Sequence, residues 1–385
     1  MACLGKPVRA LGLMTGTIID GFVDVAVLET DGVEVFDLGP ASLVPYDARL
    51  NALLKDVLEE AVAWHFDGPE PKIFQEAERA LTLAQAEAVR AFLSEAGLSR
   101  HDIDLIGFHG QTVFHRAPEN GHHGQTRQLG DGQLMADELR IDVAYDFRTA
   151  DMQAGGHGAP LSACYHAALM RYSDLRPNTA VLNLGGVANI TWWGGEDEFV
   201  GFDSGPASGP INDWVARHGL GEMDLDGRLA LEGVVDEARL STMMEHPFFS
   251  QSFPKSLDRF DFTDSFVEGL SPEDGAATLS AFIGETIDAA FRLMPLRPDQ
   301  LITCGGGRNN PALLRAIAER ADVVVKTAED VGWRGDAVEA ECFGYLAVRT
   351  LNELPFSFPF TTGVEEPMTG GVIAKGALQL AEERQ

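Results

Sequence analysis

Residues 8–38 have the sequence VRALGLMTGTIIDGFVDVAVLETDGVEVFDL, and this segment predicts three consecutive strands. Val8–Met14 is a compact apolar run, and Val23–Leu28 is rich in valine and alanine, as buried strands often are. The dipeptide Asp31-Gly32 is a strong signal for a two-residue hairpin, and a third strand at Val33–Leu38 follows it. We therefore expect the chain to open as an antiparallel meander.

Helical periodicity follows the meander. Apolar residues at helical spacing predict one helix around residues 50–61 and a second over about 74–96. Residues 104–108 and 143–147 have the composition of buried strands, and a helix is predicted between them at 131–139. The first part of the chain thus has the predicted order βββαβαβ.

The opening pattern recurs after a glycine-rich break at Gly155–Gly158. Ala180–Trp193 predicts a second apolar hairpin around Gly185-Gly186, and Phe199–Asp203 predicts a further strand. The order of elements repeats, although no repeat is visible in the sequence itself. The remaining predictions are helices at about 163–170, 210–217, 276–293, 311–320 and 336–354 and strands at 301–304 and 323–326.

Length and composition limit the classes of function. The 385 residues predict two domains or one large duplicated fold, and a hydrophobic fraction of 45% supplies a core. The net charge of -30 would repel a phosphate backbone, which argues against nucleic acid as a partner. Four scattered cysteines without a C-x-x-C pair indicate a reducing compartment. Since we find neither a cleavable leader nor a run of about 18 apolar residues, we expect a cytoplasmic protein without a membrane partner.

Three glycine-rich turns each follow a predicted strand directly. Glycine lets backbone N–H groups approach an anionic ligand and threonine hydroxyls add donors, so the turns together indicate phosphate binding. For each turn alone, the alternative is a hairpin that needs a positive φ. Neither a G-x-x-x-x-G-K-[ST] loop nor a G-x-G-x-x-G turn occurs, which argues against the two common nucleotide-binding folds. The turns are Thr15-Gly16-Thr17 with Asp20-Gly21, Gly185-Gly186, and Gly305-Gly306-Gly307.

Two carboxylates near these glycines are candidates for nucleotide chemistry, which needs Mg²⁺ and a base that activates the nucleophile. Asp20 lies in the first turn. Asp203 ends a predicted strand before a Gly-Pro turn, at the position where α/β folds bind ligands. The alternative for Asp203 is a turn or helix-capping aspartate.

Clustered histidines offer a metal site as a further alternative. No H-E-x-x-H motif occurs, and the adjacent pair His122-His123 lies in a predicted loop that would point the rings apart, so loop histidines are favoured. Asp224-x-Asp226-Gly227 is similar to the start of a calcium loop, but Val235 stands where that loop needs glutamate, and we discard it. The clustered histidines are His109, His115, His122, His123, His157 and His166.

Segments spread over nearly the whole chain carry a family resemblance. They are Leu13–Thr17, Phe108–Val113, Gln128–Gly132, Asp146–Arg148, Gly155–Leu161, Asn183–Asn189, Gly201–Pro206 and Cys304–Asn309. In combination and in order they closely resemble the anhydro-N-acetylmuramic acid kinase family. The resemblance implies the α/β, two-lobed actin-like ATPase fold of sugar kinases, with an interlobe cleft. The implied lobes are residues 1–158 plus 372–385 and residues 159–371.

The resemblance also implies roles for individual residues. Asp203 matches the family's catalytic base, and Asp20 matches a loop carboxylate near Mg²⁺. The implied ATP-binding residues are Gly16, Thr17, Ile18, Ile19, Asp20, Gly21, Gly185, Gly186, Asn189, Gly305, Gly306, Gly307 and Asn309. The implied sugar-binding residues are His109, Gln111, Thr112, Arg148 and Glu339. Arg148 would suit the lactyl carboxylate, because a guanidinium offers two parallel donors.

The implied reaction couples two events in peptidoglycan recycling and amino-sugar metabolism. Asp203 draws a proton from water that attacks the anomeric carbon of 1,6-anhydro-N-acetylmuramic acid. The freed O6 then takes the γ-phosphoryl group of ATP, and N-acetylmuramic acid 6-phosphate results. A homodimer is an expectation from the family alone.

The chain departs from the family pattern in several segments near the implied site. Ile18 replaces a serine, Phe22 is an extra residue, His157 replaces a glutamine, and Ala207-Ser208 replaces Gly-Asn. Two of these changes, Ile18 and Ala207-Ser208, motivate a second hypothesis, in which a catalytically weak relative binds nucleotide or muropeptide fragments as a sensor. A third hypothesis, a metal-dependent sugar hydrolase, rests on the clustered histidines.

Overall fold

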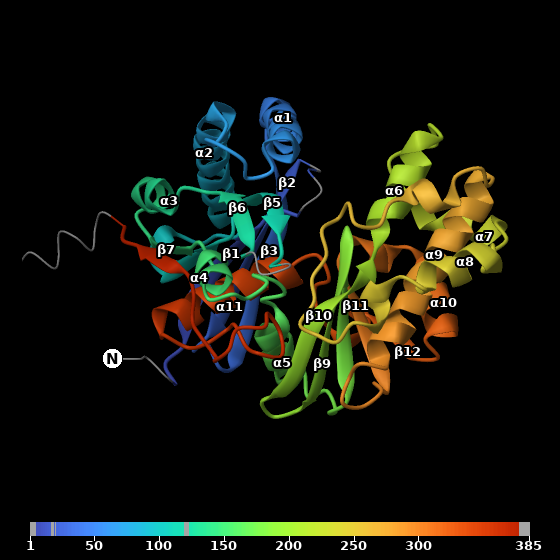
Figure 1. The fold of residues 1–385 in the computed structure, drawn as a ribbon. Helices are drawn as coiled ribbons and strands as arrows, with labels where there is room; N and C mark the ends of the chain where they lie inside the picture. Colours follow the sequence, from blue (N-terminus) through green and yellow to red (C-terminus); the bar gives the residue numbers. More distant parts are fainter. Residues whose placement is uncertain (1–4, 17–18, 20, 119–122, 377–385) are drawn as a thin grey trace, which may run out of the picture. The chain divides into compact units, whose positions relative to one another are not determined.

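The computed structural model describes residues 5–16, 19, 21–118 and 123–376. The chain divides into two compact units (Figure 1). Unit 1 comprises Met1–Tyr172 and Ala337–Gln385, and unit 2 comprises Ser173–Asp336.

Unit 1 is built on a six-stranded sheet with the order β13-β7-β4-β1-β2-β3. The hairpin of β1 and β2 is antiparallel, with Val8 opposite Thr30 and Met14 opposite Asp24, and β4 and β7 continue the sheet in parallel from β1. The predicted meander is therefore confirmed. The strands are β1 (Val8–Met14), β2 (Phe22–Thr30), β3 (Val35–Pro45), β4 (Leu105–Phe108), β7 (Asp142–Tyr145) and β13 (Val372–Ala374).

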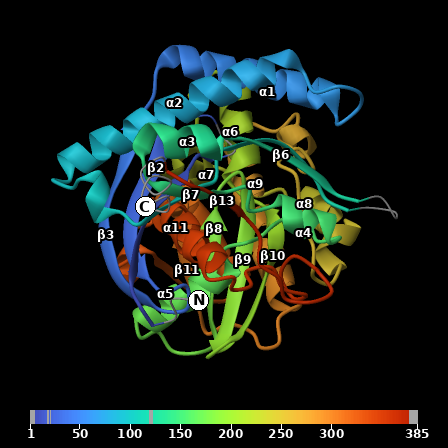
Figure 2. The ribbon, with the colours of Figure 1, turned by 90° about the vertical axis from the view of Figure 1, so that its left-hand side faces the viewer.

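Alternation along the strands decides which helices cover each face. Leu11 and Leu13 share an apolar cluster with residues of α2 and α3 on one face. Gly12 and Gly107 face α11 on the other, and a Cβ at Gly12 would lie 1.7 Å from the Ala340 carbonyl oxygen. In Figure 2, α1 and α2 run side by side. The helices of unit 1 are α1 (Ala48–Trp64), α2 (Lys72–Glu95), α3 (Gly132–Leu139), α4 (Thr149–Gln153), α5 (Ala163–Tyr172) and α11 (Val338–Leu351).

A two-stranded antiparallel sheet follows β4 and was not predicted from the sequence. It consists of β5 (Gln111–Arg116) and β6 (Gln125–Leu129), with Gln111 opposite Leu129. Both strands mix polar and apolar residues, and the connection between them lacks a two-residue turn signal. The hairpin brings polar side chains next to the end of β4.

Unit 2 repeats the topology of unit 1. Its sheet order, β10-β9-β8-β11-β12, corresponds strand by strand to β3-β2-β1-β4-β7, with two antiparallel pairs followed by two parallel ones. This repeated order confirms the predicted actin-like α/β class. The strands are β8 (Thr179–Leu184), β9 (Val187–Gly195), β10 (Glu198–Pro206), β11 (Gln300–Cys304) and β12 (Val324–Thr327).

The long helix α9 supplies much of the core of unit 2, because most of its side chains are buried. The helices are α6 (Ser208–Arg217), α7 (Arg228–Glu232), α8 (Glu237–Met244), α9 (Pro272–Phe291) and α10 (Pro311–Arg320). Short 3-10 helices in the chain lie at Arg100–Asp102, Leu225–Gly227, Pro247–Ser250, Asp264–Val267, Gly306–Asn309 and Glu329–Val331.

The unit boundaries differ from the lobes implied by resemblance at both junctions. Residues 159–172 and 337–371 pack with unit 1 rather than with unit 2. The reason is that α11 covers β1, β2 and β4, and α5 is fixed to it by a hydrogen bond of 2.5 Å from the Tyr165 hydroxyl to Glu341. Such tertiary contacts leave no mark at the boundary in the sequence.

Candidate active site

The two predicted glycine turns of unit 2 lie side by side. The parallel strands β8 and β11 end together, with Asn183 opposite Cys304, so the turns that follow meet at one edge of the sheet. A Cβ at Gly305 would lie 2.3 Å from Asn183 Oδ1. The start of α6 is bonded to the first of these turns, since the Ser208 N–H donates to the Gly185 oxygen at 2.9 Å.

Two glycines in these turns are not required by the fold. Neither Gly185 nor Gly306 is among the described glycines with positive φ. A Cβ at Gly306 would meet nothing within 4 Å, and one at Gly185 would meet only the Val187 oxygen at 3.6 Å. The hairpin alternative therefore does not explain these two glycines. Missing side chains here leave backbone accessible to a ligand, as phosphate-binding turns require.

Arg308 anchors the second of these turns, although the sequence argument gave it no role. It is 6% exposed, donates to the Gly305 oxygen at 3.1 Å, and pairs with Asp336 at 2.7 Å and Glu329 at 3.0 Å. The hydrogen bonds to these carboxylates raise the pKa of the guanidinium more than its burial lowers it. A permanently charged arginine thus ties the glycine turn to the segment before α11. The next residue, the predicted ligand Asn309, is exposed.

Asp203 lies in β10, where its side chain is buried at 6% exposure. The Leu257 N–H donates to its Oδ2 at 2.9 Å, and its own N–H donates to the Lys255 oxygen at 3.1 Å. Ala207 is the residue at the N-cap of α6 and no side chain caps that helix, so Asp203 is not a helix cap. A bulge between Asp203 and Gly205 interrupts the pairing with β9 directly after the carboxylate.

Asn189 is opposite Asp203 in the register of β9 and β10. Its side-chain oxygen is buried and lacks a hydrogen-bond partner within the described part of the chain. Buried polar atoms in native proteins are nearly always paired, so an orphaned oxygen beside a carboxylate indicates a site that a ligand, ion or water completes. The role of Asn189 toward the nucleotide stays a prediction.

In unit 1, a neutral histidine and an arginine form a rigid pair. The Arg148 Nε and Nη2 atoms donate to His109 Nε2 at 3.2 and 3.1 Å, and the Arg148 Nη1 donates to the Gly158 oxygen at 2.6 Å. His109 Nδ1 lies 2.8 Å from the Gly110 oxygen, so this nitrogen carries the proton. Burial, and then the Arg148 charge, lower the pKa of His109 to about 3. His109 is therefore neutral over the physiological range.

Gln111 ties the segment after β1 to the start of β5. Its side chain is fully buried, and its Nε2 donates to the Gly16 oxygen at 2.9 Å and to the Thr112 oxygen at 3.2 Å. The Gln111 Oε1 is buried without a partner among the described residues. The Thr15 hydroxyl adds a bond of 2.9 Å to the Gly110 oxygen. Predicted nucleotide and sugar residues of unit 1 are thus joined directly.

The first glycine turn is only partly described. The predicted residues Thr17, Ile18 and Asp20 lie outside the described residues. Ile19 packs in an apolar cluster with residues of α1 and α2, so its side chain serves the core. Gly21 has a φ of 91° and its oxygen accepts the Tyr46 N–H at 2.9 Å.

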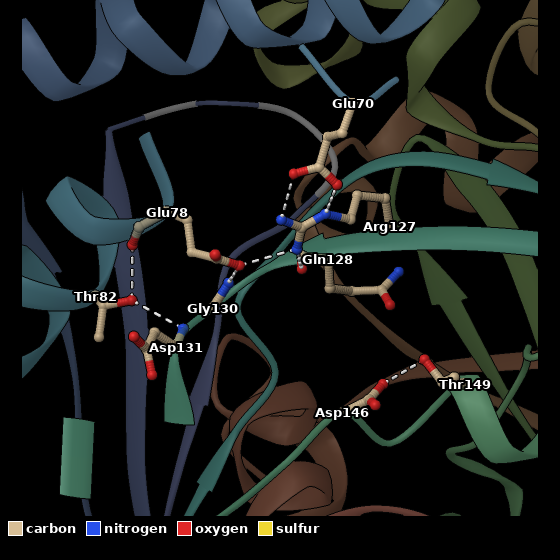
Figure 3. A network of polar contacts seen from close by, with 9 residues as sticks. All are labelled: Glu70, Glu78, Thr82, Arg127, Gln128, Gly130, Asp131, Asp146 and Thr149. Carbon is tan, nitrogen blue, oxygen red and sulfur yellow. Dashed lines mark hydrogen bonds and ion pairs between the residues drawn. The ribbon is translucent and has the colours of Figure 1, made fainter. Parts of the chain in front are cut away.

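A cavity of about 220 Å³ lies in unit 1 beside His109. Its lining residues come from the end of β4, from β6, from the end of β7 and from the start of α4. Asp146 has a φ of 55° and accepts a hydrogen bond of 2.5 Å from the Thr149 hydroxyl, so the backbone is strained at the wall (Figure 3). The lining residues are Phe108, His109, Thr126, Arg127, Gln128, Gly130, Tyr145, Asp146 and Thr149.

An ion-pair network holds the hairpin to α2 (Figure 3). Arg127 pairs with Glu70 and with Glu78, both at 2.9 Å, and Glu78 also accepts the Gly130 N–H at 3.0 Å. The Asp131 N–H donates to the Thr82 hydroxyl at 3.1 Å. These bonds fix the turn after β6, which forms part of the cavity wall. They join residues distant in sequence, so no local signal could have revealed them.

Glu339 lies half-buried in the first turn of α11. Burial raises the pKa of the Cys342 thiol, the Glu339 carboxylate raises it further, and Arg148 opposes the shift. Glu339 and Arg148 therefore act on the same buried thiol, which places two predicted sugar-binding residues in one region of unit 1.

His157 donates its backbone N–H to the Thr362 oxygen at 2.7 Å.

Neither a metal-binding cluster nor a membrane helix is found in the part of the chain that the structure describes. Among those residues, no group of three or more histidine, cysteine, aspartate or glutamate side chains is arranged to hold a metal ion. None of the helices in the same residues is long and apolar enough to span a membrane. The described cysteines Cys164, Cys304 and Cys342 are buried.

The duplicated sheet and the paired glycine turns define the actin-like ATPase class. A family model described as anhydro-N-acetylmuramic acid kinase matches residues 8–376. A relative of that name from Brucella anthropi is 57% identical, and the match covers 95% of this chain and 99% of the relative. Another from Rhizobium rhizogenes is 56% identical, and the match covers 96% of this chain and 100% of the relative. A relative from Jannaschia, anhydro-N-acetylmuramic acid kinase 2, is 58% identical, and the match covers 95% of this chain and 97% of the relative. The chain belongs to the anhydro-N-acetylmuramic acid kinase family.

Proposed function

We propose that this protein is an ATP-dependent kinase that opens 1,6-anhydro-N-acetylmuramic acid and phosphorylates its O6, giving N-acetylmuramic acid 6-phosphate. Family membership supports the reaction. The structural observation that carries the proposal is that Gly185 and Gly306, which neither packing nor φ requires, lie in adjacent turns of the unit that holds the buried Asp203. Such turns offer backbone donors to phosphate.

Asp203 is the proposed general base. Its carboxylate takes a proton from water, the water oxygen bonds to the anomeric carbon, and the bond from that carbon to O6 breaks. O6 then attacks the γ-phosphorus, and ADP leaves. A general base typically contributes about 10²- to 10⁴-fold to the rate. The Leu257 N–H on Oδ2 fixes the orientation of the carboxylate during these steps.

The proposed ATP-binding groups in unit 2 are the backbone of the two turns together with Asn189 and Asn309. Bound Mg²⁺ would offset negative charge on the transferring phosphoryl group. Asp20, the carboxylate expected near Mg²⁺, lies outside the described residues, and the orphaned oxygen of Asn189 is an oxygen donor of the type that this ion prefers. Gly16 and Gly21 belong to the proposed first phosphate loop.

The proposed sugar-binding groups in unit 1 are His109, Gln111, Thr112, Arg148 and Glu339. The guanidinium of Arg148, which His109 and the Gly158 oxygen hold in place, is the proposed donor to the lactyl carboxylate. His109, being neutral, does not compete with the arginine for that carboxylate. The buried Gln111 Oε1 is an acceptor for a sugar hydroxyl or amide.

The sensor hypothesis is not favoured. Its motives were Ile18, which lies outside the described residues, and the replacement of Gly-Asn by Ala207-Ser208. The N–H groups of Ala207 and Ser208 both donate to the glycine turn, to the Gly186 oxygen at 3.2 Å and to the Gly185 oxygen at 2.9 Å. The departure therefore preserves the backbone that the turn needs. We further propose a cytoplasmic homodimer acting in peptidoglycan recycling, for which size in solution and a localisation experiment are the tests.

The direct test of the function is ADP release from Mg-ATP in the presence of 1,6-anhydro-N-acetylmuramic acid, with the product identified by mass spectrometry. We expect ADP and N-acetylmuramic acid 6-phosphate in equal amounts, and no turnover with N-acetylglucosamine. Tight binding of both ligands without turnover at saturating Mg-ATP would instead support the sensor hypothesis.

A further inference from the structure

The glycine-rich break after α4 folds around one buried aspartate. Asp151 is 1% exposed, and the Gly158 N–H donates to its Oδ1 at 2.6 Å. The Gly156 N–H donates to the backbone oxygen of Asp151 at 2.9 Å. Between them, the His157 N–H donates to the Thr362 oxygen at 2.7 Å. Three consecutive N–H groups are therefore paired, and they fix the conformation of this loop.

Two glycines of the loop are required by its packing around the aspartate. A Cβ at Gly156 would lie 2.2 Å from Asp151 Oδ1. Gly158 has a φ of 70°, and a Cβ there would lie 2.4 Å from Met152 Sδ. Only glycine adopts such positions without strain. The glycine-rich break thus lets the backbone approach the carboxylate closely.

The same glycine holds Arg148 through its other backbone group. The Arg148 Nη1 donates to the Gly158 oxygen at 2.6 Å, while Nε and Nη2 donate to His109 Nε2. Asp151 therefore reaches the guanidinium through a single residue, whose N–H and C=O are both engaged. Loss of the carboxylate would release Gly158, and with it one of the acceptors that orient the arginine.

The second carboxylate oxygen argues against a purely stabilising role. Asp151 Oδ2 is buried and lacks a hydrogen-bond partner among the described residues. Such an atom is unfavourable to bury, so a neutral acceptor would serve stability better. A charged acceptor, however, makes the stronger hydrogen bond to a backbone N–H. The aspartate therefore favours a firmly held Gly158 over the stability of unit 1.

We propose that Asp151 is a positioning residue for the selection of the sugar acid: through the Gly158 N–H it fixes the loop whose oxygen orients Arg148. This inference rests on the proposed role of Arg148 toward the lactyl carboxylate. A guanidinium binds a carboxylate best through two parallel N–H bonds, which requires a defined orientation. An arginine that is already oriented loses less conformational entropy when the sugar binds.

The test compares two ligands that differ in the charge of the lactyl group, 1,6-anhydro-N-acetylmuramic acid and its methyl ester, with Kd measured by calorimetry. Wild type should prefer the acid by about 10- to 100-fold, because the ester lacks the charge that Arg148 binds. In Asp151→Ala, the affinity for the acid should fall about tenfold, while that for the ester changes by less than about twofold.

Three further variants separate positioning from other effects. Asp151→Asn keeps an acceptor for the Gly158 N–H and should retain most of the preference for the acid. The matched control is Asp137→Ala, at an exposed aspartate of α3, which should bind both ligands as wild type does. In an Arg148→Met background, Asp151→Ala should cause no further loss of affinity for the acid, because its effect passes through the arginine.

An equal loss of affinity for the acid and the ester in Asp151→Ala would show that Asp151 is merely structural and would overturn the inference. An unchanged preference in that variant would overturn it as well. If Arg148→Met keeps the wild-type preference, the role of Arg148 fails and the inference with it. Absence of turnover in wild type would instead refute the proposed function, while the binding preferences remain measurable.

A second measurement needs no substitution. Hydrogen exchange of the Gly158 N–H is followed in wild type, saturated with the acid or with the ester. Because coupling between two sites is reciprocal, a ligand that engages Arg148 should slow this exchange by about fivefold or more relative to the ester. Equal protection of the Gly158 N–H by the two ligands would refute the coupling even if the alanine variant fails to fold.

Discussion

The two units share one sheet topology but place their polar groups in different ways. In unit 1 the groups come from an added hairpin after β4, and side chains such as Gln111 and Arg148 bond to backbone oxygens. In unit 2 the buried acid sits on the edge strand β10, and the backbone of residues 255–257 holds it. In each unit, a segment outside the main sheet therefore holds the polar groups in place.

The units also differ in the charge of the group next to the proposed site. His109 in unit 1 is neutral, with a pKa lowered to about 3, whereas Lys255 in unit 2 is charged at neutral pH with a pKa of about 8. Unit 1 presents the Arg148 guanidinium beside a neutral histidine, which suits selection of a sugar acid. Unit 2 presents the buried carboxyl group of Asp203, which suits proton abstraction.

The largest expected effect concerns the acid of unit 2. Asp203→Asn should lower kcat by about 10²- to 10⁴-fold because the general base is lost, while ATP affinity stays nearly unchanged. Steady-state kinetics and calorimetric ATP binding measure the two quantities. The control is Asp213→Asn, an exposed carboxylate of the same unit, which should be close to wild type. A near-normal rate in Asp203→Asn would remove Asp203 from this role.

The next effect concerns the arginine of unit 1. Arg148→Met removes charge-assisted hydrogen bonds of about 1.5–3 kcal/mol, so kcat/KM for the anhydro sugar should fall about 10- to 100-fold. The KM for ATP should not change. Arg140→Met, at an exposed arginine of the same unit, is the control. If Arg148→Met raised only the KM for ATP, the assignment of Arg148 to the sugar would be wrong.

A smaller effect concerns two neighbouring glycines in the turn after β11, Gly306, which the fold does not require, and Gly305, which it does. Gly306→Ala adds a Cβ that meets no protein atom within 4 Å, so stability should hold while the KM for ATP rises about tenfold, the equivalent of one lost hydrogen bond. Gly305→Ala should destabilise the fold, because Gly305 has a φ of 73° and the added Cβ would lie 2.3 Å from Asn183 Oδ1. Equal ATP affinity in Gly306→Ala and wild type would contradict phosphate binding at this turn.

The smallest effect is acid sensitivity of unit 1. Burial lowers the pKa of His109 and His166 to about 3 and that of His115 to about 4. The unfolded chain binds protons below about pH 6.5 while the folded unit does not, so stability is lost as the pH falls from there toward 4. His166→Gln should reduce the slope of unfolding free energy against pH by about 1.4 kcal/mol per unit, measured by denaturant titration. An unchanged slope would mean that His166 takes up a proton in the folded state.

Local sequence signals explain which parts of the fold and of the candidate site could be predicted. The apolar runs and Asp31-Gly32 predicted β1 to β3 because period and turn chemistry act within a few residues. The same holds for the glycine turns after β8 and β11 and for the position of Asp203 on a strand. The hairpin of β5 and β6 was missed, because its strands are polar and their connection has no two-residue turn signal.

The remaining features depend on tertiary contacts. Arg308 gains its role only from two carboxylates beyond β12. The assignment of α11 to unit 1 likewise follows from its packing on β1, whose Gly12 has no room for a side chain. Spacing along the chain carries no information on such contacts.

The central claim is that water activated by Asp203 attacks the anomeric carbon while O6 accepts the phosphoryl group. The most direct measurement is a single turnover in water enriched in the heavy oxygen isotope, followed by immediate borohydride reduction and mass spectrometry of the product. The account predicts one heavy oxygen at the anomeric position and none in the phosphoryl group. Heavy oxygen in the phosphoryl group or in released phosphate would contradict it.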